Sequence, residues 1–219
     1  MKLIKNLLFE YFPERSRRAK AGGFLLLLLT GISGFTTTDE TTTRLKTKSR
    51  EAGSFCKTKG YNTEFCILID MTIHSGKKRA FLYDLKKDSV LASGMCAHGC
   101  GANPWASTYT KDKPVFSNVP DSHCSSLGKF MIGKRGYSNW GIKVNYILNG
   151  LEPTNSNAKK REIVLHSWED VSDTEIYPEG VPEGWGCPAV SNAFMKVVDP
   201  CLRASSKPVL LWIYNWVTG

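Results

Sequence analysis

The chain has 219 residues, of which 42% are hydrophobic and 22% are charged, and this ordinary globular composition suits one domain with a terminal appendage. Its formal net charge of +9 divides into +4 for residues 1–20, with six basic and two acidic residues, and +5 for the remainder, with 23 basic and 18 acidic residues. Because these charges are scattered and form no stripe with interleaved aromatic residues, the sequence argues against nucleic-acid binding.

The N-terminus has the pattern of an export signal. Basic residues 1–20 precede the uncharged run AGGFLLLLLTGISGF, residues 21–35, which is shorter than the roughly 18 residues that a membrane-spanning helix needs. A basic region before a run of this length is typical of a secretory signal. No clean small-x-small cleavage site follows, so an uncleaved signal anchor is the alternative. We therefore expect an exported protein of the cell envelope or periplasm, free or held at the cytoplasmic membrane by residues 21–35.

The folded domain is predicted to begin near residue 51. Residues 36–50, TTTDETTTRLKTKSR, are polar and lack an apolar period, which predicts a linker. Helical pattern is limited to short pieces near 49–59 and 191–203, and the Gly-, Ser-, Asn- and Pro-rich stretch 99–126 predicts a functional loop. Short apolar runs predict strands over residues 65–71, 80–85, 88–98, 127–133, 144–150, 161–167 and 208–216. Residues 51–219 should therefore form a mainly β (α+β) domain, a curved or barrel-like sheet with short outer helices.

Seven cysteines in an exported chain permit three disulfides and one leftover thiol. Cys56 and Cys66 form one candidate pair, and we expect another disulfide to involve Cys96, Cys100 or Cys124. The sequence does not fix the pairing.

A zinc site is the alternative for part of this set. Cys96, His98 and Cys100 lie within five residues, and His123 and Cys124 could complete the ligands. No second pair with usual zinc spacing is evident, so we expect no metal.

The segment EGWGCPAVS, residues 183–191, places Cys187 in a constrained turn. A thiol with an ordinary pKa near ~8.5 needs a neighbouring histidine to act as a nucleophile at neutral pH. His166 ends the apolar strand REIVLHS and could supply that help. Gly184 and Gly186 would let N–H groups of the turn point at one spot, as in an oxyanion hole. The alternative is a structural or disulfide-bonded Cys187.

Several motifs in order make the chain resemble the murein L,D-transpeptidase catalytic domain family. They are FCILIDMTIHSGKKRAFLYDL, AHGCG, FSNVPDSHCSSLGKFMIG, EIVLHS and GCPAVS, spread from about residue 54 to the C-terminus. The resemblance implies that family's curved β-sandwich or barrel fold. Two departures stand out, because Gly184-Trp185-Gly186-Cys187 replaces the family's Ser-His-Gly-Cys and Pro188-Ala189 replaces its Ile/Val-Arg.

The resemblance also implies roles for individual residues. Cys187 would be the acyl-accepting nucleophile and His166 its base, oriented by a main-chain carbonyl at Ser167, while Gly186 and Cys187 would offer N–H groups to the oxyanion. Ser126 and Gly128 would line the substrate groove. His98 could replace the histidine missing before Cys187, or it could be a structural histidine on a loop, and Trp185 is a further candidate for substrate binding. The loop aromatics Trp105, Tyr109, Trp168 and Trp185 could stack on sugar rings or close a lid.

The implied reaction is acyl transfer without a cofactor. The thiolate would attack the third residue of a peptidoglycan tetrapeptide stem and expel the terminal D-alanine, and an amine of a second stem would resolve the thioester into a 3→3 cross-link. The partners are thus donor and acceptor stem peptides and no nucleic acid. L,D-carboxypeptidase trimming and a non-catalytic cell-wall-binding domain are the alternatives, and the oligomeric state stays open.

Overall fold

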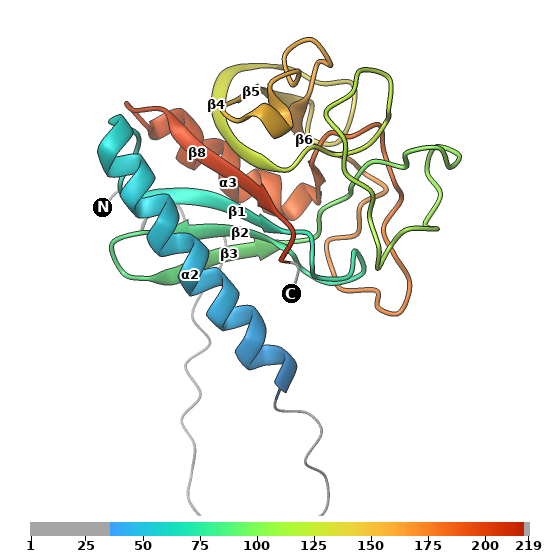
Figure 1. Ribbon diagram of the computed structural model, residues 1–219, viewed down its shortest axis with the longest axis horizontal. Coiled ribbons are helices and arrows are strands. Elements are labelled where there is room, and N and C mark those ends of the chain that lie inside the picture. Colours follow the sequence, from blue (N-terminus) through green and yellow to red (C-terminus); the bar gives the residue numbers. More distant parts are fainter. Residues whose placement is uncertain (1–35, 217–219) are drawn as a thin grey trace, which may run out of the picture.

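The structure, a computed structural model, describes residues 36–216 (Figure 1). The export signal predicted for residues 1–35 lies outside the described residues. Between residues 36 and 216, no helix is both long and apolar enough to cross a membrane. The elements are α2 (Thr36–Lys59), β1 (Phe65–Asp70), β2 (Ala80–Asp84), β3 (Ser89–Gly94), β4 (Gly128–Tyr137), β5 (Val144–Gly150), η1 (Pro153–Asn155), β6 (Val164–Ser167), β7 (Ala189–Val190), α3 (Asn192–Ala204) and β8 (Val209–Tyr214).

The strands form one mixed sheet of eight strands in the order β3-β2-β1-β8-β4-β5-β6-β7. The pairs β1–β8 and β6–β7 are parallel, and the other neighbours are antiparallel. A bridge between Cys96 and Val190 joins the segment after β3 to β7. Because β3 and β7 are the two ends of the sheet, this bridge nearly closes it. The predicted mainly β fold with a barrel-like sheet is confirmed.

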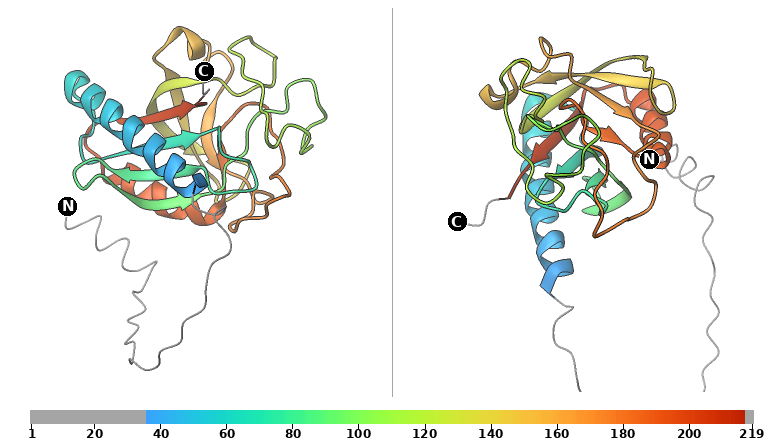
Figure 2. Two further views of the ribbon diagram at one scale, coloured as in Figure 1. Left: turned by 60° about the horizontal axis from the view of Figure 1, so that its bottom comes forward. Right: turned by 90° about the vertical axis from the view of Figure 1, so that its right-hand side faces the viewer.

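Strand β1 is buried along its whole length because helices cover both faces of the sheet. Ile67 and Ile69 pack into a core that includes Phe194 of α3, whereas Leu68 packs into a second core with Leu45 of α2. Figures 1 and 2 show α2 crossing one face of the sheet and α3 lying on the other. Successive strand residues point to opposite faces, so the continuous apolar run in β1 serves two cores.

The prediction of a linker over residues 36–50 is wrong, because this segment is the first part of helix α2. Its buried residues Leu45, Ser49, Ala52 and Cys56 recur at intervals of three or four and form one stripe against the sheet. Only Leu45 among them is a large apolar residue, so the sequence gives little sign of an apolar helix face here. The folded unit therefore includes residues before 51.

The expected disulfides are also not formed, because all seven cysteines are free thiols. Cys56 and Cys66 lie in the same apolar core between α2 and the sheet, and burial raises the pKa of Cys56 to about 11. Buried free cysteine behaves as a small apolar residue. These cysteines fill the core rather than link it.

Candidate active site

The pairing of β6 with β7 places His166 and Cys187 in the wall of one pocket. The register sets His166 opposite Ala189 at the start of β7. Cys187, two residues before Ala189, therefore lies beside Val164, whose N–H is 3.4 Å from the Cys187 sulfur. The predicted nucleophile and base thus line one pocket, His166 from β6 and Cys187 from the turn before β7.

The turn before Cys187 requires glycine at one position. Gly186 has φ +101°, and a Cβ there would collide with the backbone oxygen of Cys124. Ser125 fixes the same turn, because its Oγ donates to the Gly186 carbonyl at 3.2 Å and accepts from the Gly99 N–H at 3.1 Å. Gly184 has no neighbour within 4 Å of an added Cβ, so only the second glycine of the turn is sterically required.

The N–H groups of Gly186 and Cys187 donate no hydrogen bond to any group in residues 36–216. The carbonyls of both residues, in contrast, are engaged, since Cys187 O accepts from the Ala189 N–H at 2.9 Å. Unengaged N–H groups next to a thiol are the donors that an oxyanion requires.

His166 is held in one tautomer by the main chain. Its Nδ1 lies 3.0 Å from the Ser167 carbonyl oxygen, which can only accept, so Nδ1 carries the proton and Nε2 has a free lone pair. Burial lowers the pKa of His166, more than the Ser167 carbonyl and Glu169 raise it. The side chain of Ser167 is turned elsewhere and accepts from the Ile142 N–H at 3.0 Å. His166 is therefore a neutral imidazole at neutral pH.

Cys187 is a protonated thiol in the same conditions. Burial raises its pKa, partly offset by the Val164 N–H and the positive charge of Arg161. Its sulfur lies 3.9 Å from the Glu162 carbonyl oxygen, and within the described chain it forms no hydrogen bond with His166. The resting site is thus a neutral thiol and a neutral imidazole.

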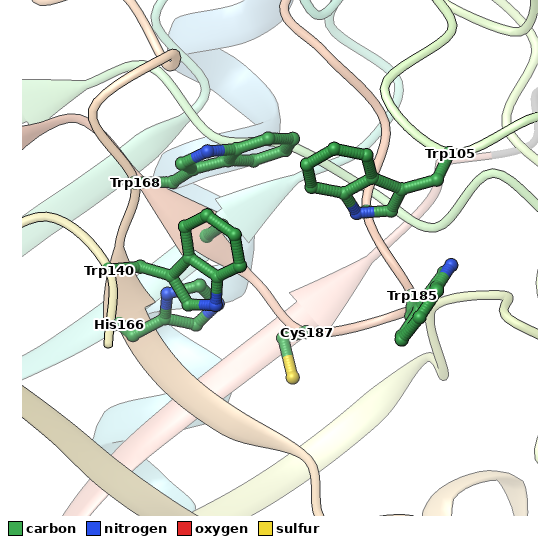
Figure 3. A pocket seen from close by; sticks show the side chains of 8 residues that line it. Trp105, Trp140, His166, Trp168, Trp185 and Cys187 are labelled. Carbon is green, nitrogen blue, oxygen red and sulfur yellow. The ribbon is translucent and has the colours of Figure 1, made fainter. Parts of the chain in front are cut away.

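Both residues open into a pocket of about 430 Å³ (Figure 3). Its walls include four tryptophans and no Asp, Glu, Lys or Arg: the lining residues are Trp105, Trp140, His166, Trp168, Gly184, Trp185, Cys187 and Ala189. Trp105 stacks on the buried Trp168 at 5.1 Å between ring centroids, and Trp140 meets Trp168 edge-on at 6.0 Å. Trp185 stacks on His123 at 5.3 Å. The pocket therefore suits an uncharged group beside the thiol.

Three of the predicted groove residues lie elsewhere. His98 is fully buried, and both of its ring nitrogens contact protein atoms, Arg79 Nη2 at 2.7 Å and Thr110 Oγ1 at 2.9 Å. Ser126 is buried and donates to the Ser117 carbonyl at 2.8 Å. The structure thus contradicts a direct role for His98 and Ser126 in lining the pocket, because neither reaches its surface.

Gly128 begins β4 beneath the η1 segment, and it does not line the pocket either. It has φ +120°, and a Cβ there would meet the side chains of Glu152, Thr154 and Asn155. This glycine permits close packing of two segments. Of the predicted groove residues, only Trp185 faces the pocket, and of the loop aromatics Tyr109 does not.

The zinc alternative has no support in the residues that the structure describes, where no three His, Cys, Asp or Glu side chains converge as metal ligands. Cys96 Sγ contacts the Ala97 carbonyl and Cys100 Sγ the Gly101 carbonyl. The side chains of this short motif point to different neighbours.

Sequence reasoning missed two residues of the site. Trp140 lies in the turn between β4 and β5 and lines the pocket, although nothing in its local sequence marks it. Arg161 lies near the Cys187 turn, where its guanidinium donates to Cys124 O and Ser126 Oγ, both at 2.6 Å. In the sequence it belongs to a short basic cluster with no evident target.

A family model described as the L,D-transpeptidase catalytic domain matches residues 39–214. The match begins inside helix α2 and ends with strand β8, so it spans the whole sheet together with Cys187 and His166. No curated protein matches the chain significantly.

Proposed function

Because the chain belongs to the family of L,D-transpeptidase catalytic domains, we propose that it is a cysteine-dependent acyl transferase that forms 3→3 cross-links between peptidoglycan stems. The family acts on peptidoglycan stem peptides. The observation that carries the proposal is the pairing of β6 with β7, which brings Cys187 to the pocket wall that holds an oriented His166.

The first half-reaction forms a thioester. The Cys187 sulfur attacks the carbonyl carbon of the third stem residue while its proton passes to Nε2 of His166. The negative charge on the carbonyl oxygen is stabilised by the unengaged N–H groups of Gly186 and Cys187. The tetrahedral intermediate collapses, the C–N bond breaks, and the imidazolium returns its proton to the departing D-alanine amine.

The second half-reaction repeats these steps with a new nucleophile. An uncharged amine of a second stem attacks the thioester, gives its proton to His166 and releases the thiol. Water in place of the amine would give a trimmed tripeptide. A Cys–His pair is sufficient for both outcomes, so they differ only in what reaches the thioester.

Mass spectrometry of the full chain with a disaccharide-tetrapeptide tests this proposal. We expect an adduct on Cys187 together with release of D-alanine, and a loss of both in Cys187→Ala. His166→Ala should slow the release by about 10²–10⁴-fold, the usual contribution of a general base. Dimeric product indicates a transpeptidase, and tripeptide alone a carboxypeptidase. Folded protein with reduced Cys187 but no adduct and no released D-alanine would favour a non-catalytic wall-binding domain.

We also propose that the protein is exported and acts outside the cytoplasmic membrane. The support is the basic and then apolar pattern of residues 1–35 and the location of peptidoglycan outside that membrane. Fractionation of cells, with the N-terminal residue of the recovered protein determined by mass spectrometry, would distinguish a cleaved signal from an anchor. Recovery from the cytosol with Met1 retained would contradict export.

A further inference from the structure

Glu183, immediately before the nucleophile turn, is fully buried and tied to the loop that carries Trp105. Its carboxylate accepts from the Thr110 N–H at 2.6 Å and from Ser107 Oγ at 3.0 Å. Its main chain is bound to the same loop, since Glu183 N–H donates to Ser107 O at 2.8 Å and Ala106 N–H donates to Glu183 O at 2.9 Å. Four hydrogen bonds thus fasten the start of the turn to one wall of the pocket.

A second segment fastens the next residue of the turn. Gly184 donates its N–H to the His98 carbonyl at 2.8 Å and accepts from the Cys100 N–H at 2.7 Å. The turn that leads to Trp185 and Cys187 is therefore held on both sides, by residues 98–100 and by residues 106–110.

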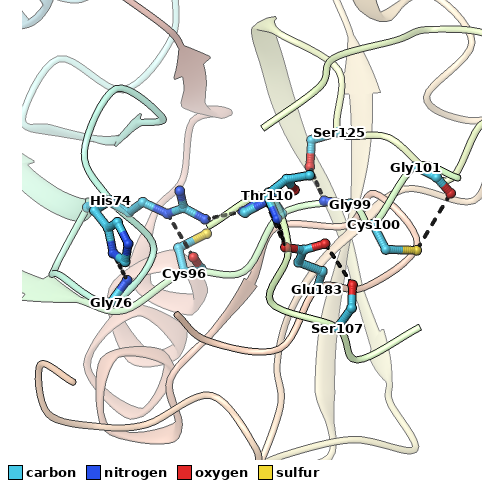
Figure 4. A network of polar contacts seen from close by, with 12 residues as sticks. His74, Gly76, Cys96, Gly99, Cys100, Gly101, Ser107, Thr110, Ser125 and Glu183 are labelled. Carbon is cyan, nitrogen blue, oxygen red and sulfur yellow. Dashed lines mark hydrogen bonds and ion pairs between the residues drawn. The ribbon is translucent and has the colours of Figure 1, made fainter. Parts of the chain in front are cut away.

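The His98 ring joins these two anchors to Arg79, and Figure 4 shows the surrounding network with Thr110, Glu183 and Ser107. Arg79 can only donate, so Nδ1 of His98 accepts at 2.7 Å and its Nε2 carries the proton, which faces Thr110 Oγ1 at 2.9 Å. Burial and the charge of Arg79 lower the pKa of His98 to about 2, so the ring stays neutral. Nε2 lies 3.8 Å from Glu183 Oε1, which places the neutral ring between the buried guanidinium of Arg79 and the buried carboxyl group of Glu183.

Arg79 in turn is anchored to the closure of the sheet. It is fully buried, and its guanidinium donates to Cys96 O at 2.8 Å and to Ile73 O at 3.2 Å. Cys96 is the residue that bridges to Val190 in β7. The chain of contacts thus runs from the closed sheet to the nucleophile turn without reaching the pocket surface.

We propose that Glu183, held through Thr110 and His98 by Arg79, is a positioning residue that fixes the Cys187 turn and the Trp105 loop in their reactive arrangement. This inference rests on the proposed function in that it takes Cys187 as the nucleophile. Glu183 touches no reacting atom. Its side chain accepts hydrogen bonds from Ser107 and Thr110. Without these bonds, the Cys187 turn and the pocket wall that carries Trp105 would no longer be held in a fixed arrangement.

Two variants of the full chain test the proposal. Ser107→Ala removes one donor to the carboxylate, and Glu183→Gln replaces a double acceptor by an amide of the same shape. We expect kcat for D-alanine release to fall about 10-fold in the first and about 100-fold in the second, since small displacements of a reacting group cost this much. Alkylation of Cys187 by iodoacetamide, followed by peptide mass spectrometry, should become faster in both, because a loosened turn exposes a thiol whose burial suppresses its reaction. Ser107→Thr keeps the hydroxyl and should keep both rates.

Ser49→Ala is the matched control. Ser49 Oγ also donates to a carboxylate, that of Asp88 at 3.1 Å, but Ser49 lies in helix α2 and does not line the pocket. Wild-type kcat and alkylation rates in Ser107→Ala, or equal changes in Ser49→Ala, would overturn the proposal. If Glu183→Gln does not fold, Ser107→Ala and Ser107→Thr test the proposal by themselves: a loss of kcat in the first but not in the second supports it, and equal kcat values in the two contradict it. If the wild type releases no D-alanine, the proposed function fails, and the alkylation rates still decide the positioning role.

Discussion

At the scale of single residues, the proposed nucleophile Cys187 and the proposed base His166 are both uncharged in the resting site. Burial acts on the two side chains in opposite directions, raising the pKa of Cys187 and lowering that of His166. An ion pair would require the reverse of both shifts. In the proposed reaction the imidazole therefore takes the thiol proton during attack, and we expect general-base catalysis.

The uncharged forms of Cys187 and His166 predict how kcat/KM and thiol alkylation depend on pH. Since His166 must be neutral to accept a proton and its pKa is lowered, kcat/KM should fall on acidification only below the ordinary histidine value of ~6.5. Because the Cys187 pKa is raised, its alkylation by iodoacetamide should climb about tenfold per pH unit from pH 6 to 8, as the thiolate fraction does. Both profiles can be measured on the wild type by stopped assays.

A preformed thiolate–imidazolium pair would give other profiles. Alkylation would be flat across that range, and the acidic limb of kcat/KM would report the thiol. His166→Ala serves as the control, because its alkylation should follow the raised thiol pKa alone.

Residues differ in how far the sequence could predict them. Cys187 and His166 were predicted as a pair from a glycine turn and a strand end, and both line the pocket. His98 was predicted as a groove residue because it could replace the histidine that the turn before Cys187 lacks, but the sequence does not show that Arg79 and Thr110 occupy both ring nitrogens. Trp140 gave no signal, because only the β4–β5 turn brings it to the pocket.

At the scale of elements, helix α2 is docked by more than its apolar stripe. Arg44 Nε lies 2.8 Å from the fully buried carboxylate of Asp70 in β1. Lys48, one turn later, lies 4.5 Å from the centre of the Trp212 ring. Polar residues thus form part of the contact between α2 and the sheet. This explains why the sequence of the segment, which is rich in Thr, Lys and Arg, predicted a linker.

We expect Arg44→Met to destabilise the protein by about 3 kcal/mol. The substitution keeps most of the side-chain stem but leaves Asp70 as an unpaired buried carboxylate, and removing one partner of a buried pair is costly. The free energy of unfolding can be measured by urea denaturation of the full chain. Asp70→Asn in the Arg44→Met background should recover part of the loss.

Glu51→Gln provides the control on the same helix. Glu51 pairs with Lys48 at 2.9 Å, but its side chain is 45% exposed, and exposed pairs contribute at most about 1 kcal/mol. Equal and small effects of Arg44→Met and Glu51→Gln would mean that α2 is not docked on the sheet in solution.

At the scale of the whole molecule, the seven predicted strands are present, but their order in the sheet was not predictable. The parallel β1–β8 pair joins the two ends of the folded chain, and the two-residue strand β7 is too short to show a pattern. Strand patterns report local burial, whereas sheet closure depends on contacts such as Cys96–Val190 between distant segments. That closure gathers the loops of Trp105, Trp140 and Trp185 into one pocket.

The closed fold also predicts how the seven thiols report on unfolding. Cys56, Cys66, Cys96, Cys100, Cys124 and Cys201 are all buried, and only Cys187 is half-exposed. Burial raises the pKa of Cys96 and Cys201 to about 11, which further suppresses their reaction. Under native conditions we therefore expect iodoacetamide to label one cysteine, Cys187, with the other six reacting only as fast as the sheet opens.

Intact-protein mass spectrometry checks both halves of this expectation. In denaturant without reductant, seven labels should be added, and native Cys187→Ala should take up none over the same time. A denatured count of five would instead reveal one disulfide, and peptide mapping would locate it. Cys56 and Cys66 lie in the core on one face of the sheet, and Cys96 and Cys201 lie in the other core. The labelling rates of these four thiols should therefore agree with one another if the domain unfolds as one unit. Faster labelling of Cys56 and Cys66 than of Cys96 and Cys201 would contradict this and show that α2 leaves the sheet before the rest of the fold opens.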